Sequence, residues 1–312
     1  MKSVNEIINL VNDEIESRFC KKVAQPNSLY EPISYILSNG GKRIRATMAL
    51  VTAQMYTDSF ADVIGPALGI EVFHNFTLLH DDIMDKADIR RGQPTVHKKW
   101  DENTAILSGD AMMILANKLI AETNAKALVS VLNVFNTTAL EVCEGQQYDM
   151  DLEKIDVSKQ TISEDEYLSM IKLKTSVLIG ASIKIGALCA GASEAEASLL
   201  YNYGINIGLA FQIQDDYLDT FGSVADFGKR IGGDILEGKK TYLLVKTLNI
   251  CDEKDKMIIC NTLQNNQMEE LEKIKTITNL YKKYGVDSLA KQKIDRYFIE
   301  ANKCLNMVNI PA

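Results

Sequence analysis

The sequence has few prolines and few of the residues that build zinc sites or disulfide frameworks. Its 312 residues include six cysteines, three histidines and five prolines. The cysteines are scattered and form no CxxC pair, so they are expected to be reduced and structural. Because proline interrupts helices, its scarcity allows helices to run for many turns. Segments with the composition of strands are also scarce.

Basic residues and long hydrophobic runs are lacking as well. The chain has 34 Lys and Arg against 42 Asp and Glu, a net charge of -8, which argues against nucleic acid as a partner. The most apolar stretch, Ser176 to Ala192, is short for a membrane span and carries Lys184 at its centre. Acids and amides interrupt the first twenty residues, unlike a signal peptide. We therefore expect a cytoplasmic protein with no stable membrane insertion.

Apolar residues recur with the period of a helix through most of the chain, and 46% hydrophobic residues suffice for a sizeable core. No linker rich in Pro, Gly or Ser divides the sequence. It predicts an all-α fold, a bundle of long helices forming a single domain over residues 1–312. Residues 221–238, dense in charge and glycine, are expected to form a functional loop. The helical stretches are Val4–Phe19, Gly41–Tyr56, Val63–Asp85, Thr104–Ala121, Ala125–Asp149, Glu164–Cys189, Glu194–Asp219 and Glu237 to the C-terminus.

Two acidic repeats end two of these stretches, DDIMD at 81–85 and DDYLD at 215–219. Residues four apart share a helix face, so the first and last aspartates of each repeat lie together. Clustered carboxylates suit hard cations, and Mg²⁺ is usually completed by substrate phosphates and water. A solvated helix end explains one such repeat about equally well. Two copies, each after strongly apolar sequence, favour a metal site for a phosphorylated ligand.

Basic residues lie close to both acidic repeats, and a third basic group precedes them. Gly40 to Arg45 reads GGKRIR, in which two glycines permit close backbone approach and three cations open a helix. Arginine and lysine are the usual protein partners of phosphate. The cations beside the repeats are Arg90, Arg91, Lys229, Arg230, Lys239 and Lys240.

Nine motifs in a fixed order resemble the trans-isoprenyl diphosphate synthase family, of the short-chain geranylgeranyl or farnesyl type. They are GGKRIR, FHNFTLLHDDIMD, DIRRGQPTVH, GDAM, EGQQYDM, LKT, FQIQDDYLD, FGKRIGGD and EGKKT, from about Gly40 to Thr241. The resemblance implies the isoprenoid synthase fold, with long helices around a central cavity. It implies a prenyltransferase that condenses isopentenyl diphosphate head-to-tail with an allylic diphosphate (dimethylallyl, geranyl or farnesyl) and releases diphosphate. It also implies Mg²⁺, with three ions, and a homodimer.

The resemblance assigns roles by motif position. The metal ligands it implies are Asp81, Asp82, Asp85, Asp215, Asp216 and Asp219. The residues for isopentenyl diphosphate are Lys42, Arg45, His74 and Arg91, and those for the allylic diphosphate are Arg90, Lys174, Thr175, Gln212, Lys229 and Lys239. The catalytic residues among these are Asp81, Asp85, Lys174, Thr175, Gln212 and Asp215, because metals and cations stabilise the leaving diphosphate while Thr175 and Gln212 stabilise the allylic cation.

His74 and Phe76 each have a purely structural alternative. A lone histidine on an apolar helix is more often a core residue, but His74 lies two turns before Asp81 on nearly the same face. Phe76 and Thr77, just upstream of Asp81, resemble the chain-length positions of geranylgeranyl-forming enzymes. They predict a C20 product, with C15 as the alternative, although Phe76 is equally well explained as a core aromatic.

Two other functions share some of these features. Terpene cyclases also have an aspartate-rich metal site on a helical fold, but they need no isopentenyl site, and the GGKRIR segment argues against them. A non-catalytic subunit of a heteromeric synthase would typically lack one acidic repeat, whereas both repeats are intact here. The catalytic interpretation is therefore favoured.

Overall fold

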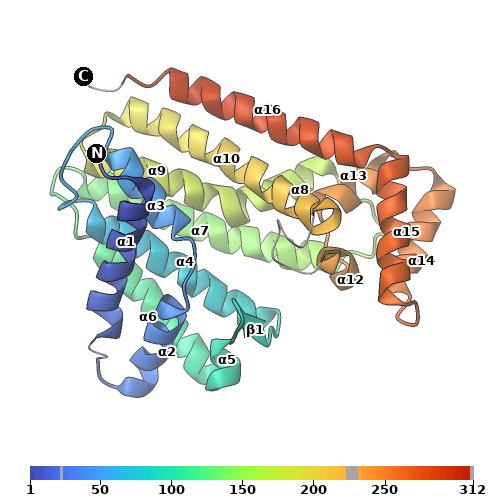
Figure 1. The fold of residues 1–312 in the computed structure, drawn as a ribbon, viewed down its shortest axis with the longest axis horizontal. Coiled ribbons are helices and arrows are strands. Elements are labelled where there is room, and N and C mark those ends of the chain that lie inside the picture. Colours follow the sequence, from blue (N-terminus) through green and yellow to red (C-terminus); the bar gives the residue numbers. More distant parts are fainter. Residues whose placement is uncertain (22–23, 223–230, 310–312) are drawn as a thin grey trace. The chain divides into compact units, whose positions relative to one another are not determined.

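The computed structural model describes residues 1–21, 24–222 and 231–309. In these ranges nearly all secondary structure is helical, apart from one ladder of two-residue strands (Figure 1). The all-α prediction is confirmed. The chain forms two compact units, unit 1 from Met1–Thr137, Ala181–Tyr201 and the last residues from Val308, and unit 2 from Thr138–Gly180 and Asn202–Met307.

Unit 1 contains the helices of the N-terminal part of the chain and the hairpin. Its elements are α1 (Val4–Ile15), the π-helical turn η1 (Glu16–Cys20), α2 (Asn27–Ser38), α3 (Ile44–Ala53), α4 (Ile64–Met84), β1 (Ile89–Arg90), β2 (Gln93–Pro94), α5 (Val96–Lys99) and α6 (Glu102–Ile120). Three further helices have residues in both units: α7 (Leu128–Glu153), α9 (Val177–Cys189) and α10 (Glu194–Phe221).

Helix α4 is the central element of unit 1, and it packs along α6 and α3. Its first ten residues, from Ile64 to Phe73, are almost all buried, as expected for a helix that is apolar on every side. The α4–α6 contact is close because Gly69 has no side chain: a Cβ there would lie 2.9 Å from the carbonyl oxygen of Ala116. Phe73 then meets Phe135 edge-on, with ring centroids 5.3 Å apart.

Unit 2 contains α8 (Glu164–Ile171), the π-helical turn η2 (Lys172–Ser176), α12 (Gly233–Glu237), α13 (Tyr242–Ile250), α14 (Glu253–Gln264), α15 (Glu270–Lys283) and α16 (Val286–Asn306). Helix α13 packs against α8 and α16, and α15 packs against α12, α14 and α16 (Figure 1). The buried rings of Tyr167, Tyr242 and Tyr281 form much of this core.

The helical stretches expected from periodicity are all found, with two corrections, at α2 and at residues 221–238. Helix α2 was not expected, because its apolar face is short and Pro32 lies within it. Pro66 lies in the first turn of α4, where its missing N–H has no intrahelical acceptor. Part of the expected loop at residues 221–238 is helical, as α12, while 223–230 lie outside the described residues.

Small residues in α9 let a neighbouring helix approach closely. A Cβ on Gly186 would lie 2.1 Å from the carbonyl oxygen of Ala49, so the α9 backbone touches α3 there. Within the described part of the chain, no helix combines the length and hydrophobicity needed to cross a membrane.

Candidate active site

A cavity of about 520 Å³ in unit 1 brings together the four residues predicted to bind isopentenyl diphosphate. Lys42 and Arg45 come from the start of α3, His74 from α4 and Arg91 from the hairpin turn. Gly41 also lines it, with a φ of 130° that favours glycine. Three cationic side chains around glycine backbone make a site suited to a multiply charged anion.

Arg45 and His74 are held together at the buried side of this cavity. The Arg45 Nη1 atom lies 3.0 Å from His74 Nε2. Burial lowers the pKa of His74 well below its usual range, and nearby arginines, Arg45 first, lower it further. Since Arg45 only donates, a neutral His74 accepts at Nε2 and carries its proton on Nδ1. Burial also lowers the pKa of Arg45 to about 10, although Glu71 opposes that shift, and Arg45 stays charged at neutral pH.

Arg43 also lines the cavity, but its guanidinium is hydrogen-bonded and ion-paired within the protein. Sequence reasoning did not identify this role. It donates from Nε to Asn12 Oδ1 at 3.0 Å and from Nη2 to the Leu37 carbonyl at 2.6 Å. Its Nη1 pairs with Glu71 Oε1 at 3.3 Å, and both side chains are only 3% exposed. Arg43 has a left-handed φ of 49° at the start of α3. This anchored, strained residue separates Lys42 from Arg45.

The hairpin turn supplies Arg91. The strands pair Arg90 with Gln93, so Arg91 and Gly92 are the two central residues, with φ values of 53° and 75°. Tight two-residue turns often need positive φ at both positions. The Arg91 guanidinium donates to the Gly40 carbonyl, and its nearest atoms would lie 3.0 Å from a Cβ on Gly41. The turn thus places a strained arginine directly over the glycine backbone.

The first acidic repeat ends α4. Asp81 is partly exposed, Asp85 is exposed and Asp82 is buried. Arg90, predicted to bind the allylic diphosphate, donates from Nε to Asp82 Oδ1 at 2.7 Å and lies 3.7 Å from Asp81 Oδ2. Burial raises the pKa of Asp82, and the Arg90 charge opposes this rise. Asp82 therefore holds Arg90 next to Asp81.

Upstream of this repeat, Phe76 is half-buried in a row of rings on α4. Its ring centroid lies 4.7 Å from that of His80 and 5.6 Å from that of Phe73. The His80 ring is wedged against α6, where a Cβ on Gly109 would lie 2.2 Å from its Nε2. The hydroxyl of Thr77 donates to the His74 carbonyl at 2.8 Å. Phe76 thus has a ring on either side along α4, and its chain-length role stays a prediction.

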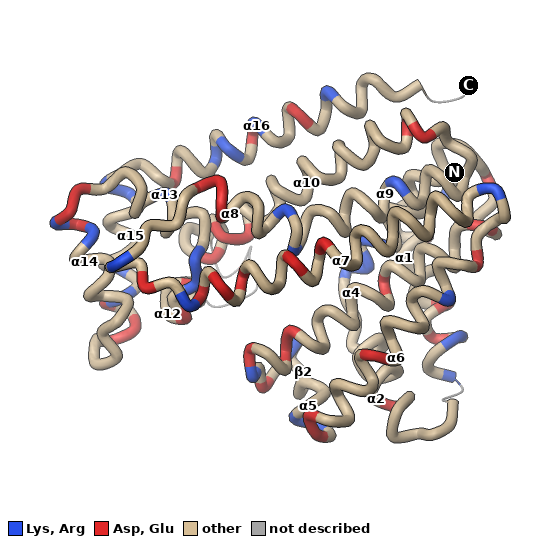
Figure 2. The backbone as a smooth tube through the Cα atoms, turned by 180° about the vertical axis from the view of Figure 1, so that it is seen from behind, with Lys and Arg blue, Asp and Glu red and all other residues tan. Residues whose placement is uncertain are grey.

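A second cavity, of about 160 Å³, lies in unit 2 and contains six of the residues predicted from the later motifs. Figure 2 shows acidic and basic residues interleaved around α12, close to this cavity's lining. The predicted residues in its lining are Lys174, Thr175, Gln212, Asp215 and Lys239, together with Asp216. Lys229 lies outside the described residues.

The LKT motif lies on the π-helical turn η2, a local widening that often marks functional positions. A Cβ on Gly145 of α7 would lie 2.2 Å from the backbone nitrogen of Lys174, so α7 and η2 approach closely. Lys174 Nζ pairs with Asp149 Oδ2 at 2.5 Å. Asp149 belongs to the EGQQYDM motif but was not assigned a role from sequence. It orients Lys174 in the cavity lining.

The three aspartates of the second repeat have different surroundings. Asp215 is partly exposed and lines the cavity. Asp216 is 5% exposed and accepts hydrogen bonds from the Tyr167 hydroxyl at 2.5 Å and from the Tyr242 backbone at 2.7 Å. Asp219 Oδ2 accepts from the Asp234 backbone at 3.1 Å, at the start of α12. Burial raises the pKa of Asp216 to about 7 and that of Asp219 to about 6.

Lys239 is held by acids that sequence reasoning left out. Its Nζ lies 2.9 Å from Glu237 Oε2 and 3.4 Å from Asp234 Oδ1. Burial lowers the pKa of Lys239, but these two carboxylates outweigh it and raise the pKa above the usual range. Asp234 follows two glycines in the FGKRIGGD motif, a local signal that could have identified it. No comparable sequence signal marks Tyr167.

The acidic repeats do not by themselves form a complete set of metal ligands. Across the residues that the structure describes, no three His, Cys, Asp or Glu side chains gather in an arrangement able to hold a metal ion. Mg²⁺ is commonly bound by one or two carboxylates plus substrate phosphates and water. The partly exposed Asp81 and Asp215 fit that pattern, each in its own unit.

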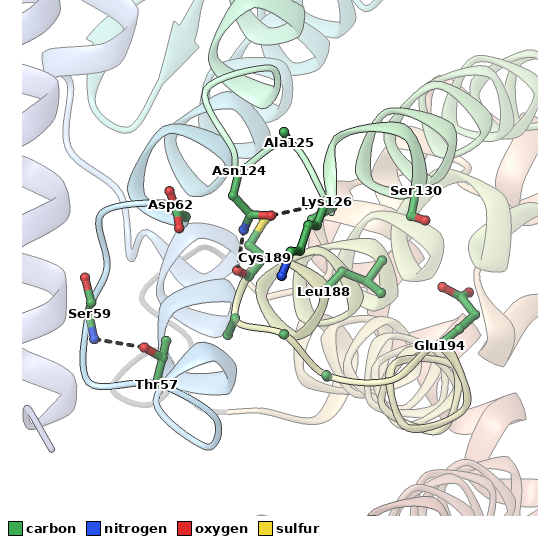
Figure 3. A pocket seen from close by; sticks show the side chains of 14 residues that line it. Thr57, Ser59, Asp62, Asn124, Ala125, Lys126, Ser130, Leu188, Cys189 and Glu194 are labelled. Atoms are coloured by element: carbon green, nitrogen blue, oxygen red, sulfur yellow. Dashed lines mark hydrogen bonds between the residues drawn. The ribbon is translucent and has the colours of Figure 1, made fainter.

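A third cavity, of about 830 Å³, contains none of the predicted site residues (Figure 3). It lies in unit 1 among the loops at Thr57, Asn124 and Gly191. The Asn124 amide bridges the carbonyl of Cys189, at 3.1 Å, and the backbone N–H of Ala127, also at 3.1 Å. These contacts tie the loops together, so the polar groups in this cavity serve the fold.

Comparisons with known proteins agree on one family. The model of the polyprenyl synthetase family matches residues 26–281. A geranylgeranyl diphosphate synthase of Sulfolobus acidocaldarius is 37% identical over 310 residues, 98% of this chain and 91% of the relative. A short chain isoprenyl diphosphate synthase of Methanothermobacter thermautotrophicus is 36% identical over 293 residues, with 93% and 88% covered. A crystal structure of a geranylgeranyl pyrophosphate synthase superposes with a TM-score of 0.92 at 44% identity, covering 100% of this chain and 94% of the other.

Proposed function

The chain belongs to the polyprenyl synthetase family, and from this premise we propose that it joins isopentenyl diphosphate head-to-tail to allylic diphosphates and releases diphosphate. One observation carries the proposal. Lys42, Arg45, His74 and Arg91, which lie up to 49 positions apart in sequence, line a single cavity. A terpene cyclase has no need for this second anion site.

The unit 1 cavity binds isopentenyl diphosphate in this proposal. Lys42 and Arg91 supply charge to the diphosphate, and Arg45 donates hydrogen bonds from a position held by His74. Glu71 balances the buried Arg43 charge, so the positive charge of the other cations remains for the ligand. The glycine backbone at Gly41 allows the diphosphate to approach closely.

The unit 2 residues act on the allylic substrate. In this proposal Lys174 and Lys239 contact the departing diphosphate from the cavity lining. Arg90 and Lys229 keep the allylic role that the family resemblance assigns to them. Thr175 and Gln212 offer oxygen atoms that stabilise the allylic cation without forming a bond to it. The cation then joins the double bond of isopentenyl diphosphate, and the released diphosphate takes the proton lost from the product.

Members of the family generally depend on divalent metal. We propose Mg²⁺, with three ions bound together with diphosphate. Asp81, Asp85 and Asp215 are the proposed ligands, with Asp82 and Asp219 in support. When bound, the metal neutralises charge on the leaving diphosphate as a Lewis acid. The hard carboxylate oxygens at these positions fit that ion.

The proposed product is C20 geranylgeranyl diphosphate, with C15 farnesyl diphosphate as the alternative. Relatives that match 98% and 100% of the chain are named as geranylgeranyl synthases. The half-buried ring of Phe76, backed by His80 and Phe73, supports a fixed end to the growing chain. Thr77 is proposed as its neighbour in this role.

We also propose that the chain acts as a single-domain protein, in the cytoplasm, and as a homodimer. Helix α6 supports the homodimer because it exposes Ile106, Leu107 and Ile114, with 44%, 60% and 65% of each residue accessible. Leu107 and Ile114, seven positions apart, share one face of the helix, and Ile106 lies at the side of that face. Exposed apolar patches of this kind mark protein interfaces.

The direct test uses purified protein with isopentenyl diphosphate and, separately, dimethylallyl, geranyl and farnesyl diphosphate. Products are resolved by chain length, with Mg²⁺ present or removed by EDTA. We expect Mg²⁺-dependent release of diphosphate and accumulation of a C20 product. Absence of condensation with all three allylic substrates would reject the proposed function, whereas C15 accumulation would reject only the product length.

A further inference from the structure

Asp216 connects Tyr167 with Gln212, and all three residues border the unit 2 cavity. Tyr167 is 1% exposed, and its hydroxyl donates to Asp216 Oδ2 at 2.5 Å. The backbone N–H of Tyr242 donates to the same oxygen at 2.7 Å. Gln212 Nε2 donates to the other oxygen, Oδ1, at 3.2 Å. Both carboxylate oxygens of Asp216 thus accept hydrogen bonds from other residues of the protein.

These contacts determine which way the Gln212 amide points. Because Gln212 donates through its Nε2 atom, its NH₂ group is turned toward Asp216. The Gln212 carbonyl oxygen then points away from Asp216, where the Thr175 hydroxyl donates to it at 3.3 Å. Both Thr175 and Gln212 line the cavity. A reversed amide would present N–H donors to a developing cation and repel it.

We propose that Tyr167 is a positioning residue, which through Asp216 fixes the Gln212 amide with its carbonyl oxygen toward the allylic carbons. The inference rests on the proposed function, since it concerns the cation formed in that reaction. It assigns Asp216 to positioning and leaves metal binding in the second repeat to Asp215 and Asp219. The hydroxyl of Tyr167 acts through Asp216, to which it donates.

Tyr167→Phe tests the first half of the proposal, with Tyr242→Phe as its matched control. Both variants remove one hydroxyl from neighbouring buried rings, whose centroids are 6.1 Å apart. Only Tyr167→Phe removes a donor from Asp216, because Tyr242 contacts Asp216 through its backbone. We expect kcat to fall about 10- to 100-fold in Tyr167→Phe, as for other misplaced catalytic groups. The KM for isopentenyl diphosphate should stay unchanged, and Tyr242→Phe should keep wild-type kcat.

Asp216→Asn tests the second half. Its amide can still accept from Tyr167 and Tyr242, but its NH₂ group then faces Gln212 and forces that amide to reverse. We expect kcat to fall at least as far as in Tyr167→Phe, while the Mg²⁺ concentration for half-maximal turnover stays within about twofold, because no metal ligand is lost. A rise of tenfold or more in that Mg²⁺ concentration would show that Asp216 binds metal and would overturn its assignment.

Two further outcomes keep this inference separate from the proposed function. Wild-type kcat in Tyr167→Phe, with prenyl transfer present in the wild type, overturns the positioning role alone. The Tyr167–Asp216 hydrogen bond is measured without turnover by a double-variant cycle of Tyr167→Phe and Asp216→Ala in denaturant unfolding, because each of these changes removes the bond. Residues in direct contact show non-additive effects, so additive changes would contradict the inference even if no prenyl transfer were found.

Discussion

Arg43→Met should destabilise the protein more than its position in a basic, glycine-rich segment suggests. The substitution removes the donors to Asn12 Oδ1, to the Leu37 carbonyl and to Glu71 Oε1. Among the described residues, Glu71, at 3% side-chain exposure, then keeps one side-chain hydrogen bond, from Asn75 Nδ2 at 3.4 Å. Breaking one partner of such a buried pair costs about 3–5 kcal/mol. Methionine and arginine have the same backbone strain at a left-handed φ, so this strain does not contribute to the difference in stability between the variant and the wild type.

The expected change in melting temperature follows from that energy. At about 2.1 cal/mol/K per residue, the unfolding entropy of the 312-residue chain is about 0.66 kcal/mol/K, so a loss of about 4 kcal/mol predicts a fall in Tm of about 6 °C. Arg18→Met is the control in the same unit, because it breaks ion pairs whose acids, Glu14 and Glu122, are 33% and 47% exposed. Such exposed pairs contribute about 0–1 kcal/mol, and the control should shift Tm only slightly.

A double variant separates two causes of the lost stability, the missing Arg43 contacts and the unpaired Glu71 charge. Arg43→Met with Glu71→Met removes both charges, and apolar replacements of a buried pair are often neutral. Calorimetry should therefore show that the double variant recovers most of the lost Tm. In the single and the double variant alike, the KM for isopentenyl diphosphate should be at least about tenfold above the wild-type value, because Lys42 and Arg45 lose Arg43 as their shared anchor. A double variant as unstable as Arg43→Met, or a single variant with wild-type Tm, would refute the reasoning.

Three further predictions concern the proposed reaction. Asp81→Ala and Asp215→Ala should each lower kcat by about 100-fold or more, because charge on the leaving diphosphate is no longer neutralised; near-normal turnover in either folded variant contradicts the role of both repeats. Arg45→Ala should raise the KM for isopentenyl diphosphate more than that for the allylic substrate, and equal increases would instead indicate general damage to the cavity. Phe76→Ala should lengthen the products made with excess isopentenyl diphosphate. Circular dichroism must first show that the variant is folded. An unchanged chain-length profile would reject Phe76 as the residue that ends growth of the chain.

The amino-acid sequence by itself determined the helices and the identity of most candidate site residues. Helix formation depends on neighbours three and four positions away, so apolar periodicity was enough to predict α4, α6 and α10. Local signals also mark helix starts, as where Ser3 and Glu6 cap α1 reciprocally and Ser163 and Glu166 cap α8. The acidic repeats and basic segments were visible because each is contiguous in sequence.

Only the tertiary structure decided which of these charged side chains face a cavity and which serve the fold. Lys42, Arg43 and Arg45 read alike in sequence, yet Arg43 turns inward because Asn12, Leu37 and Glu71 offer acceptors from elsewhere in unit 1. The two leading aspartates of the second repeat differ for the same reason. Both line the cavity, but Asp216 is buried and accepts from the Tyr167 hydroxyl and the Tyr242 backbone, 49 and 26 positions away, while Asp215 is partly exposed. Side-chain direction depends on such distant donors and acceptors, which no local pattern encodes.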